Sequence, residues 1–419
     1  MRTAGFPICG AGLTVAAMFA GLGAGVRAHG DGVADWTLGL RSASVAVRAD
    51  SAEALAKQAQ RSGGRAACRP AYTALVTALG DPVESVRRQA LRALASLDGR
   101  SDVPGLLRLM ESSDPRVREA GAILLGILAD RRAAPRLAVA VHDRDAAVRA
   151  ASTEALGAIG DPRAGASLVP LLTDADARVR GKAAAALGAL RDGEAAAPIV
   201  RLLDDPDPGV ARAAAVALAR IGNRSVAPDL MRIVGRNAGA GRFGVRFYAA
   251  YALGALGDRR AVPTLVRGLS DRQRDVRVAA AAALSQLRDP ASEHGLISGL
   301  HDPSDLMRWT CAQALGNLRD RRAVPGLIAA LKDHSEDVRE QAAKALGKIG
   351  DRSAVPALVA VFRDSDEAIP KTAVLALGRI GDPSALPAVK MLLTHRDAGV
   401  RLAAAEVVRS LSNAAPVRP

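Results

Sequence analysis

Aromatic side chains are scarce in this 419-residue sequence, which has five Phe, three Tyr and two Trp residues. A core with so few rings must be filled by small and branched aliphatic side chains, and these suit the close packing of helices. Histidine and cysteine are scarce too, with six and three residues. No Cys-x-x-Cys pair, His-Glu-x-x-His segment, Gly-Lys-Ser/Thr loop or Gly-x-Ser-x-Gly turn occurs, so the motifs of common metal, nucleotide and serine-nucleophile enzymes are missing.

Acidic residues are fewer than basic ones, 43 against 57, and the formal net charge is +14. A basic surface favours acidic proteins, anionic lipid head groups or nucleic acid as partners. The alternative is that the positive charge reflects composition and not a partner. Arg greatly outnumbers Lys, as expected from a coding sequence biased towards Ala, Gly and Arg. Both interpretations stay open at this point.

Long apolar runs are absent except near the start. Residues 3–26 carry no charge, follow Arg2 and centre on the apolar run 13–20. We expect residues 1–28 to be an export signal that is cleaved after Ala28, which places the mature protein in a bacterial periplasm. An uncleaved anchor in the inner membrane is one alternative, although the stretch is Gly-rich and contains Pro7. A cytosolic start is the other.

One apolar register returns through most of the chain, usually followed by Arg. Its spacing is 31 residues everywhere except for one spacing of 35, between Val210 and Val245. A fixed period of this size indicates a stacked repeat protein with an extended surface instead of a single pocket. The register residues are Val86, Val117, Val148, Val179, Val210, Val245, Val276, Met307, Val338, Ile369 and Val400.

Each repeat has the pattern of two antiparallel helices. In the copy that starts at Asp174, apolar residues at spacings of three and four predict a first helix over 177–190, and a shorter helix follows over 196–203. Four residues after the register position every copy has a small side chain, such as Ala183 or Cys311. Pro commonly begins the second helix, where no backbone hydrogen bond is lost. These prolines are Pro104, Pro135, Pro228, Pro263, Pro325, Pro356 and Pro387.

The predicted fold is therefore all-α, a right-handed α-solenoid of about ten helix pairs with degenerate ends. We expect the repeats over 81–413, with a lone last helix at 398–411, and an N-terminal capping region over 29–80. That region would hold an irregular lead-in at 30–48 and helices at 52–61 and 70–79. Residues 414–419 would be a disordered tail.

The cysteines fit a packed core better than a disulfide framework. Cys9 lies in the expected signal, and several repeats separate Cys68 from Cys311. Stacked helices lie about 8–10 Å apart, whereas a disulfide needs Cα atoms within about 7 Å. We interpret Cys311 as core filler.

The repeat resembles the HEAT repeats of the phycobilisome bilin lyase type. The copy at 333–361 carries Val338-Arg339, Ala345-Leu346-Gly347 and Ile349-Gly350-Asp351, with Ser335 at the position of the capping Asp. The resemblance implies a ladder in which the recurrent Arg pairs with a capping Asp, broken at Ala211 and Pro370. The Arg residues that fit are Arg87, Arg118, Arg149, Arg180, Arg246, Arg277, Arg308, Arg339 and Arg401.

Enzyme activity is not indicated by the residues. Di-iron hydroxylases among the relatives use His-Glu dyads, and none of the six His residues here precedes Glu. The resemblance leaves open a lyase-like protein that binds or attaches a tetrapyrrole. Acidic pairs such as Asp143/Asp145 and Asp364/Asp366 start helices in register, so helix capping explains them. We therefore name no catalytic residue, no metal ligand and no cofactor.

The clearest departure from the repeat is an insertion at 235–243, a Gly-rich stretch that includes Arg242. Four of the ten aromatic residues lie between positions 243 and 251. Tyr251 follows Phe247 by one helical turn on the same face, with Tyr248 beside it.

An apolar stripe follows from the same register. The position of Phe247 holds Val278 and Trp309 in the next two copies. Exposed apolar patches of this kind mark interaction sites. There are two alternatives. The aromatic residues could pack as local core beneath a loop whose sequence has diverged without a function, or they could line a pocket for a small ligand.

A basic row on the shorter helices completes the predicted site. Arg201, Arg232 and Arg267 share one position in three successive copies. The sequence thus predicts a non-enzymatic scaffold that binds an acidic or extended protein through these arginines and the aromatic residues. Export makes nucleic acid the least expected partner, and weak contact with an anionic membrane surface stays possible.

Overall fold

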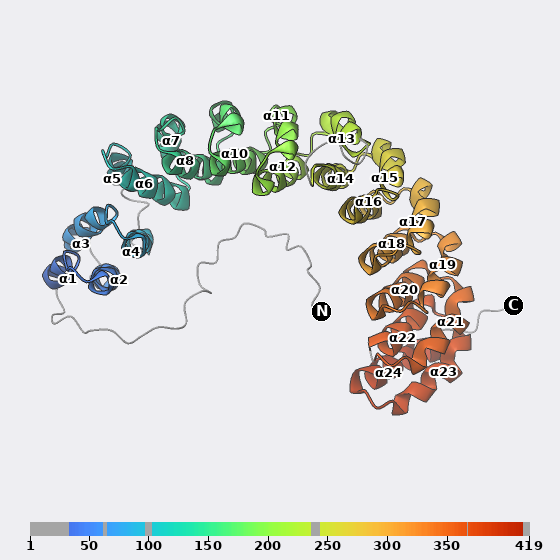
Figure 1. The fold of residues 1–419 in the computed structure, drawn as a ribbon. Coiled ribbons are helices and arrows are strands. Elements are labelled where there is room, and N and C mark those ends of the chain that lie inside the picture. The colour runs from blue at the N-terminus through green and yellow to red at the C-terminus, as the bar shows by residue number, and fades with distance from the viewer. Residues whose placement is uncertain (1–32, 62–64, 97–102, 236–243, 367, 414–419) are drawn as a thin grey trace. The chain divides into compact units, whose positions relative to one another are not determined.

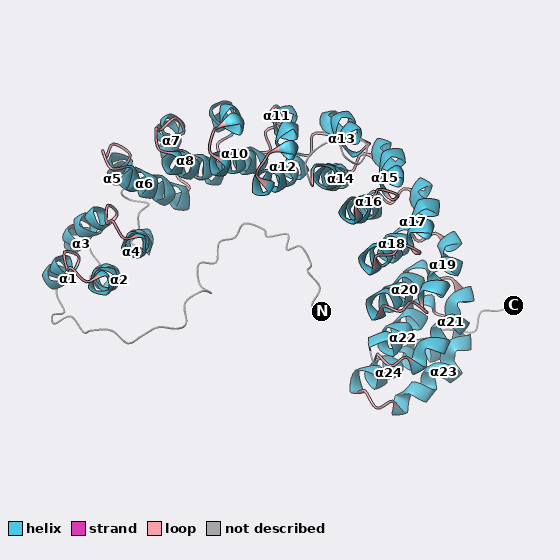
Figure 2. Ribbon diagram, in the orientation of Figure 1, coloured by secondary structure: helices cyan, strands magenta, loops and turns pink. Residues whose placement is uncertain are grey.

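The computed structural model describes residues 33–61, 65–96, 103–235, 244–366 and 368–413. These residues form α-helices joined by short turns, with 3₁₀ turns between many of the helices and no strand (Figure 2). The expected signal at 1–28, most of the insertion and the tail at 414–419 lie outside them. Among the described residues, no helix is both long and apolar enough to span a bilayer.

In most repeats a longer first helix pairs with a shorter second helix, although the second helix at Arg65–Ala78 has 14 residues. The chain forms two units, 1–102 and 103–419. The first helices are α2 (Val45–Arg61), α4 (Glu84–Ser96), α6 (Pro115–Leu128), α8 (Ala146–Ile159), α10 (Ala177–Leu190), α12 (Pro208–Ile221), α14 (Val245–Leu256), α16 (Arg274–Leu287), α18 (Asp305–Leu318), α20 (Glu336–Ile349), α22 (Ala368–Ile380) and α24 (Ala398–Asn413). The others are α1 (Val33–Gly39), α3 (Arg65–Ala78), α5 (Val103–Leu109), α7 (Ala134–Ala140), α9 (Gly165–Leu168), α11 (Ala196–Arg201), α13 (Ala227–Val234), α15 (Val262–Gly268), α17 (Glu293–Gly299), α19 (Val324–Ala330), α21 (Val355–Ala360) and α23 (Leu386–Met391).

Unit 1 contains α1 to α4 and differs in part from the prediction. The predicted helices at 52–61 and 70–79 correspond to α2 and α3, but both begin earlier, at Val45 and Arg65. The expectation of an irregular lead-in at 30–48 is wrong for much of its length, because α1 and the first turn of α2 lie within it. Leu55 and Leu75 are fully buried, so α2 and α3 bury apolar faces as a true repeat does.

Unit 2 is a stack of helix pairs in two layers, with the first helices in one layer and the second helices in the other (Figure 1). The predicted first helix at 177–190 matches α10, and the predicted second helix becomes α11 followed by a 3₁₀ turn at Leu202–Asp204. The register residue Val179 and the small residue Ala183 are fully buried. Cys311, at the same position as Ala183, is buried as well, and burial raises the pKa of its thiol to about 12.

Glycine sets the close approach of neighbouring first helices. A Cβ added at Gly188 would lie 2.7 Å from the Cα atom of Ala217 in the next first helix, and Gly157 and Gly347 face Ala186 and Ala376 in the same way. The neighbouring atoms are backbone or Cβ atoms, which cannot move without shifting a helix. The glycine of the Ala-Leu-Gly triplet therefore fixes the distance between neighbouring first helices.

We expect Gly188→Ala to lower the melting temperature. Gly→Ala inside a helix ordinarily stabilises by about 1 kcal/mol, but overpacking at this contact costs about 1–3 kcal/mol. Gly193→Ala is the matched control, because an added Cβ there meets only Asn223 Nδ2, at 3.7 Å. Thermal unfolding followed by circular dichroism measures both; a higher melting temperature for Gly188→Ala would contradict the tight contact.

The predicted Arg–Asp ladder is confirmed for most of unit 2, and Arg180 shows how a rung ties three elements together. Arg180 donates from Nε and Nη2 to the Asp205 carboxylate of the next repeat, both at 2.7 Å. Its Nη1 donates to the carbonyls of Asp174 and Ala175 in its own loop, at 2.9 and 3.1 Å. Asp205 in turn accepts from the backbone N–H of Asp207. The rungs of unit 2 are Arg118–Asp143, Arg149–Asp174, Arg180–Asp205, Arg246–Asp271, Arg277–Asp302, Arg308–Asp333 and Arg339–Asp364.

Two predicted rungs do not form. Among the described residues, Arg87 donates to the carbonyls of Asp81 and Pro82 within unit 1, and the position of its expected partner holds Ser112. Arg401 lies in the last helix and donates to the carbonyls of His395 and Arg396. A further rung that the sequence analysis missed joins Arg48 to Asp81 in unit 1, at 2.7 Å.

The second acid of each pair caps a helix, as predicted. Asp145 accepts from the N–H groups of Ala147 and Val148, and Asp366 accepts from that of Ala368. Ser335 departs from the expectation, since its side chain makes no capping hydrogen bond although its backbone stands at the cap of α20. Acidic Glu336 and Asp337 occupy the first turn there and favour the same helix end electrostatically.

Candidate functional site: the aromatic face of the first helices

The start of α14 is built around a glycine and two rings. Gly244 stands at the N-cap with φ 98° and offers no capping side chain. A Cβ there would lie 3.3 Å from Tyr248 Cε2, so glycine both permits the backbone angle and leaves room for the ring. Tyr248 packs edge-on against Phe247, with ring centroids 5.2 Å apart and planes at 78°. The insertion is thus followed by a helix start that collects aromatic side chains.

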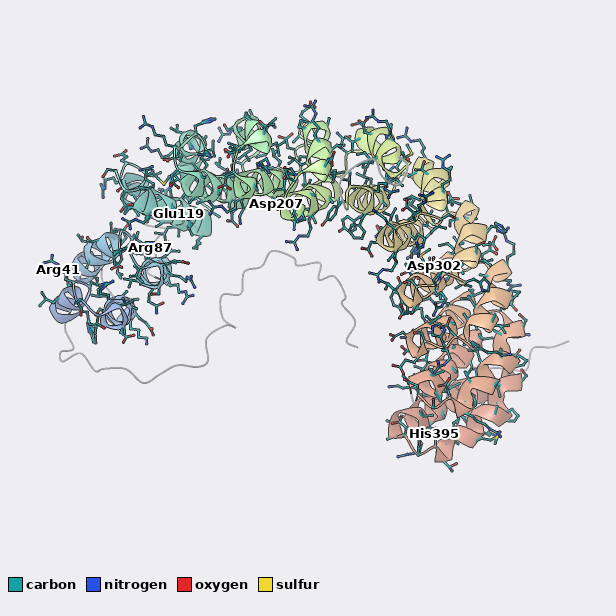
Figure 3. The ribbon with its side chains drawn as sticks, viewed as in Figure 1. Arg41, Arg87, Glu119, Asp207, Asp302 and His395 are labelled. Atoms are coloured by element: carbon teal, nitrogen blue, oxygen red, sulfur yellow. The ribbon has the colours of Figure 1, made fainter. Side chains whose placement is uncertain are left out.

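The side chains of the stripe predicted across three repeats are only partly buried by their neighbours. Phe247 on α14, Val278 on α16 and Trp309 on α18 are half-buried, and Tyr251 is 39% exposed. These positions belong to the side of the first-helix layer that the second helices leave uncovered, since charged residues hold the same position in other repeats. Glu119 on α6 is one example (Figure 3), and Glu340 on α20 is another.

Leu306 extends the stripe and was missed by the sequence analysis. It lies one turn before Trp309 on α18 and is 47% exposed. Its position holds Arg, Asp, Gly, Ala or Ser in the other repeats from 85 to 399, so a leucine there is a departure that the repeat register could have revealed. We call Phe247, Tyr251, Val278, Leu306 and Trp309 the aromatic face.

The basic row lies in the other layer. Arg201 on α11, Arg232 on α13 and Arg267 on α15 are all exposed on second helices, whereas the aromatic face belongs to first helices (Figure 1). Arg232 forms an ion pair with Asp229 at 2.6 Å, and Arg267 Nη2 donates to Thr264 Oγ1 at 3.3 Å. The structure therefore brings the aromatic residues together but does not join the arginines to them. Arg242 lies outside the described residues.

Titratable groups do not gather into a reaction centre in the part of the chain described by the structure. No group of three or more His, Cys, Asp or Glu side chains there could hold a metal ion. The carboxylates that interact most strongly are those of the ladder and the caps, and Cys311 is enclosed in the core. The geometry offers a surface and not a pocket of chemical groups.

A family model for HEAT repeats matches residues 33–125, 103–188, 165–242, 239–294, 293–369 and 350–409. The chain belongs to the HEAT-repeat family. The match covers most of the sequence and describes HEAT repeats in general, so it does not distinguish the bilin lyase type. No curated protein sequence matches this chain.

Solved HEAT-type solenoids share the fold at low sequence identity. Importin beta superposes with a TM-score of 0.63 at 17% identity, over 90% of this chain and 57% of that one. Kap95p bound to RanGDP gives 0.61 at 14% identity over 90% and 56%, and Kap121p bound to Pho4p gives 0.61 at 15% over 90% and 49%. This HEAT-repeat chain thus spans about half the length of those structures. At such identities the likeness shows the fold alone; the Kap95p and Kap121p structures are described with the protein partners RanGDP and Pho4p.

Proposed function

We propose that this HEAT-repeat protein is an exported, non-enzymatic scaffold that binds an extended segment of a partner protein on the aromatic face. The proposal is supported chiefly by one observation: apolar side chains occupy, on three successive first helices, positions that hold charged or small residues in most other repeats. Aromatic anchors of this kind dominate binding energy at protein interfaces.

The spacing of the face favours an extended segment over a globular surface. Neighbouring helices lie about 8–10 Å apart, and an extended chain in the polyproline II conformation advances about 3.1 Å per residue with about three residues per turn, so that every third side chain lies on one face. A partner segment with an apolar side chain at every third residue would match α14, α16 and α18 in turn. The arginines Arg201, Arg232 and Arg267 would then form a separate basic surface on the other layer.

The exposure of the side chains determines which variant tests the proposal. Phe247 and Trp309 are half-buried and contribute to packing, whereas Tyr251 and Leu306 are the more exposed members. We expect Tyr251→Ala/Leu306→Ala to bind partner at least about tenfold more weakly, with a melting temperature close to that of the unsubstituted protein. Crosslinking capture from the exported fraction identifies the partner, and titration of the purified partner measures the loss.

Glu340→Ala/Lys371→Ala is the matched control, because both residues occupy the position of Phe247 on α20 and α22. Equal binding by the test variant and this control would contradict the aromatic face as the docking site. A large drop in melting temperature for the test variant would assign the face to the core. A visible absorbance band that co-purifies with the protein and is lost in the test variant would instead favour the tetrapyrrole alternative.

A further inference from the structure

A second surface lies at the opposite ends of the first helices. Arg288 and Arg319 directly follow α16 and α18, and Lys348 and Arg379 are the penultimate residues of α20 and α22. The three arginines are exposed and Lys348 is half-buried. Arg319 lies ten residues beyond Trp309, about 15 Å along the helix. We call these four cations the basic edge; it is distinct from the aromatic face.

Two members of the basic edge adopt an unfavourable backbone conformation. Arg288 and Arg319 have φ values of 49° and 57°, in the left-handed region. Five other repeats place glycine at this point, namely Gly160, Gly222, Gly257, Gly350 and Gly381, with φ between 66° and 77°. A side chain is disfavoured there in an L-residue. Since glycine supports the same turn elsewhere, the fold does not need these arginines. Ala129 and Arg191 adopt the same conformation after α6 and α10, so the edge is marked by its charge and not by the backbone angle alone.

A line of hydrogen bonds holds the lysine in the middle of the edge. Asn317 Nδ2 donates to Ser285 Oγ at 2.9 Å, and Lys348 Nζ donates to Asn317 Oδ1 at 2.8 Å. The ammonium group is therefore anchored by a neutral amide and not by a carboxylate. Burial lowers the pKa of Lys348, and the charges of Arg379, Arg288, Arg319 and Lys344 lower it further. Positive charge thus accumulates around this amine.

Among the described residues, the carboxylates of the adjoining turns form no ion pair with the basic edge and have other partners. Asp320 pairs with Arg322 at 2.6 Å, and Glu293 pairs with the same arginine at 3.2 Å. Asp289, Asp351 and Asp382 accept from backbone N–H groups of their own turns. Within the residues that the structure covers, the side chains of Arg288, Arg319 and Arg379 make no hydrogen bond or ion pair.

We propose that the basic edge binds an acidic segment of an extended polypeptide, laid along the stack across four repeats. Helices about 8–10 Å apart match carboxylates at every third residue of an extended polyproline II chain, which advances about 3.1 Å per residue and completes a turn in about three residues, so that these carboxylates share one face. Arginine suits this partner because its guanidinium group binds a carboxylate through two parallel hydrogen bonds. The site does not depend on the aromatic face and would persist if that face proved to be core.

The test uses the full chain and a fluorescent peptide of about twelve residues with Asp at every third position, read by fluorescence anisotropy. We expect Arg288→Gly/Arg319→Gly to weaken binding about tenfold, the equivalent of two lost ion pairs, and added salt to weaken the binding of the unsubstituted protein. Because the substitutions replace strained residues by the glycine of other repeats, the melting temperature should not fall.

Arg191→Gly is the matched control. Arg191 also follows a first helix, α10, with φ 53°, but lies outside the edge. If Arg191→Gly weakens peptide binding as much as the double variant does, the loss reflects the net charge of the protein and the proposal is overturned. Unchanged binding by the double variant would overturn it as well. If polyuridylate binds more tightly than the peptide and loses affinity in the double variant, the edge binds phosphate chains and the acidic polypeptide is wrong. Tyr251→Ala/Leu306→Ala should bind the acidic peptide normally, which separates this site from the aromatic face.

Discussion

Arg180→Ala is expected to lower the free energy of unfolding by about 3 kcal/mol, because it removes one partner of a largely buried ion pair. The side chains of Arg180 and Asp205 are only 14% and 5% exposed. Without the guanidinium group, Asp205 keeps its backbone N–H partner but loses its compensating charge. The carbonyls of Asp174 and Ala175 lose their donors at the same time. Urea unfolding followed by circular dichroism measures the change.

Arg178→Ala is the matched control for this prediction. Arg178 lies two residues away on the same helix and pairs with Asp176 at 3.0 Å, but its side chain is 68% exposed. An exposed pair of this kind contributes less than about 1 kcal/mol. Arg180→Ala/Asp205→Ala should recover part of the loss, since it removes the unpaired charge. If Arg178→Ala and Arg180→Ala lower the free energy of unfolding equally, the buried ion pairs of the ladder contribute no more than exposed pairs, and the prediction is wrong.

Acid should unfold the repeats over the pH range in which the ladder carboxylates take up protons. Arg118 lowers the pKa of Asp143 through its hydrogen bonds, and Arg149 does the same for Asp174. At Asp302, Asp333 and Asp364 burial acts to raise the pKa, but the bound arginine and a backbone N–H together lower it. A carboxylate with a lowered folded pKa stabilises the protein above its unfolded pKa, about 3.9, and loses that contribution as pH falls through the folded value.

We therefore expect the melting temperature to be nearly constant from about pH 7 to pH 5 and to fall steeply below about pH 4. Asp174→Asn should lower stability at neutral pH and reduce the slope of the acid branch, because it removes one titrating group. Added salt should relieve repulsion between exposed cations but should not restore the lost rungs, which are poorly screened. A melting temperature that stays constant down to about pH 3 would contradict this role of the ladder.

The fold was predictable because the repeat is fixed by residue size at a few positions. The register residue, the small residue four positions later and the Asp pair before each helix placed α10 correctly from Ala177 to Leu190. The first repeat was predicted only as a degenerate pair, with both helices beginning too late, because Val47 lies 39 residues before Val86 instead of 31. The same signature is present there, however: Val47-Arg48, then Ser51 and Leu55, both fully buried. A search by signature instead of by spacing would have found it.

The candidate site was less predictable because a one-dimensional pattern does not assign positions to layers. The sequence placed Phe247 and Trp309 on first helices and Arg232 on a second helix, but only the packing of the two helix layers shows that the rings and the arginines do not share one surface. Leu306 was overlooked because its position had not been compared across repeats. The basic edge was overlooked because the cost of an arginine at 288 or 319 depends on a backbone angle that the sequence does not contain.

The interruptions of the ladder make the stack unevenly stiff. Neither Ala211 nor Pro370 can supply a rung, and His395 holds the position of an acid after the second interruption (Figure 3). The helix pairs α12–α14 and α22–α24 also pack less extensively than the other neighbouring first helices of unit 2. Since a repeat protein is coupled only through nearest neighbours, elastic deformation concentrates at these two joints. One of them adjoins α14, so a load applied by a partner on the aromatic face would be taken up beside it, while the rigid blocks on either side keep their internal geometry.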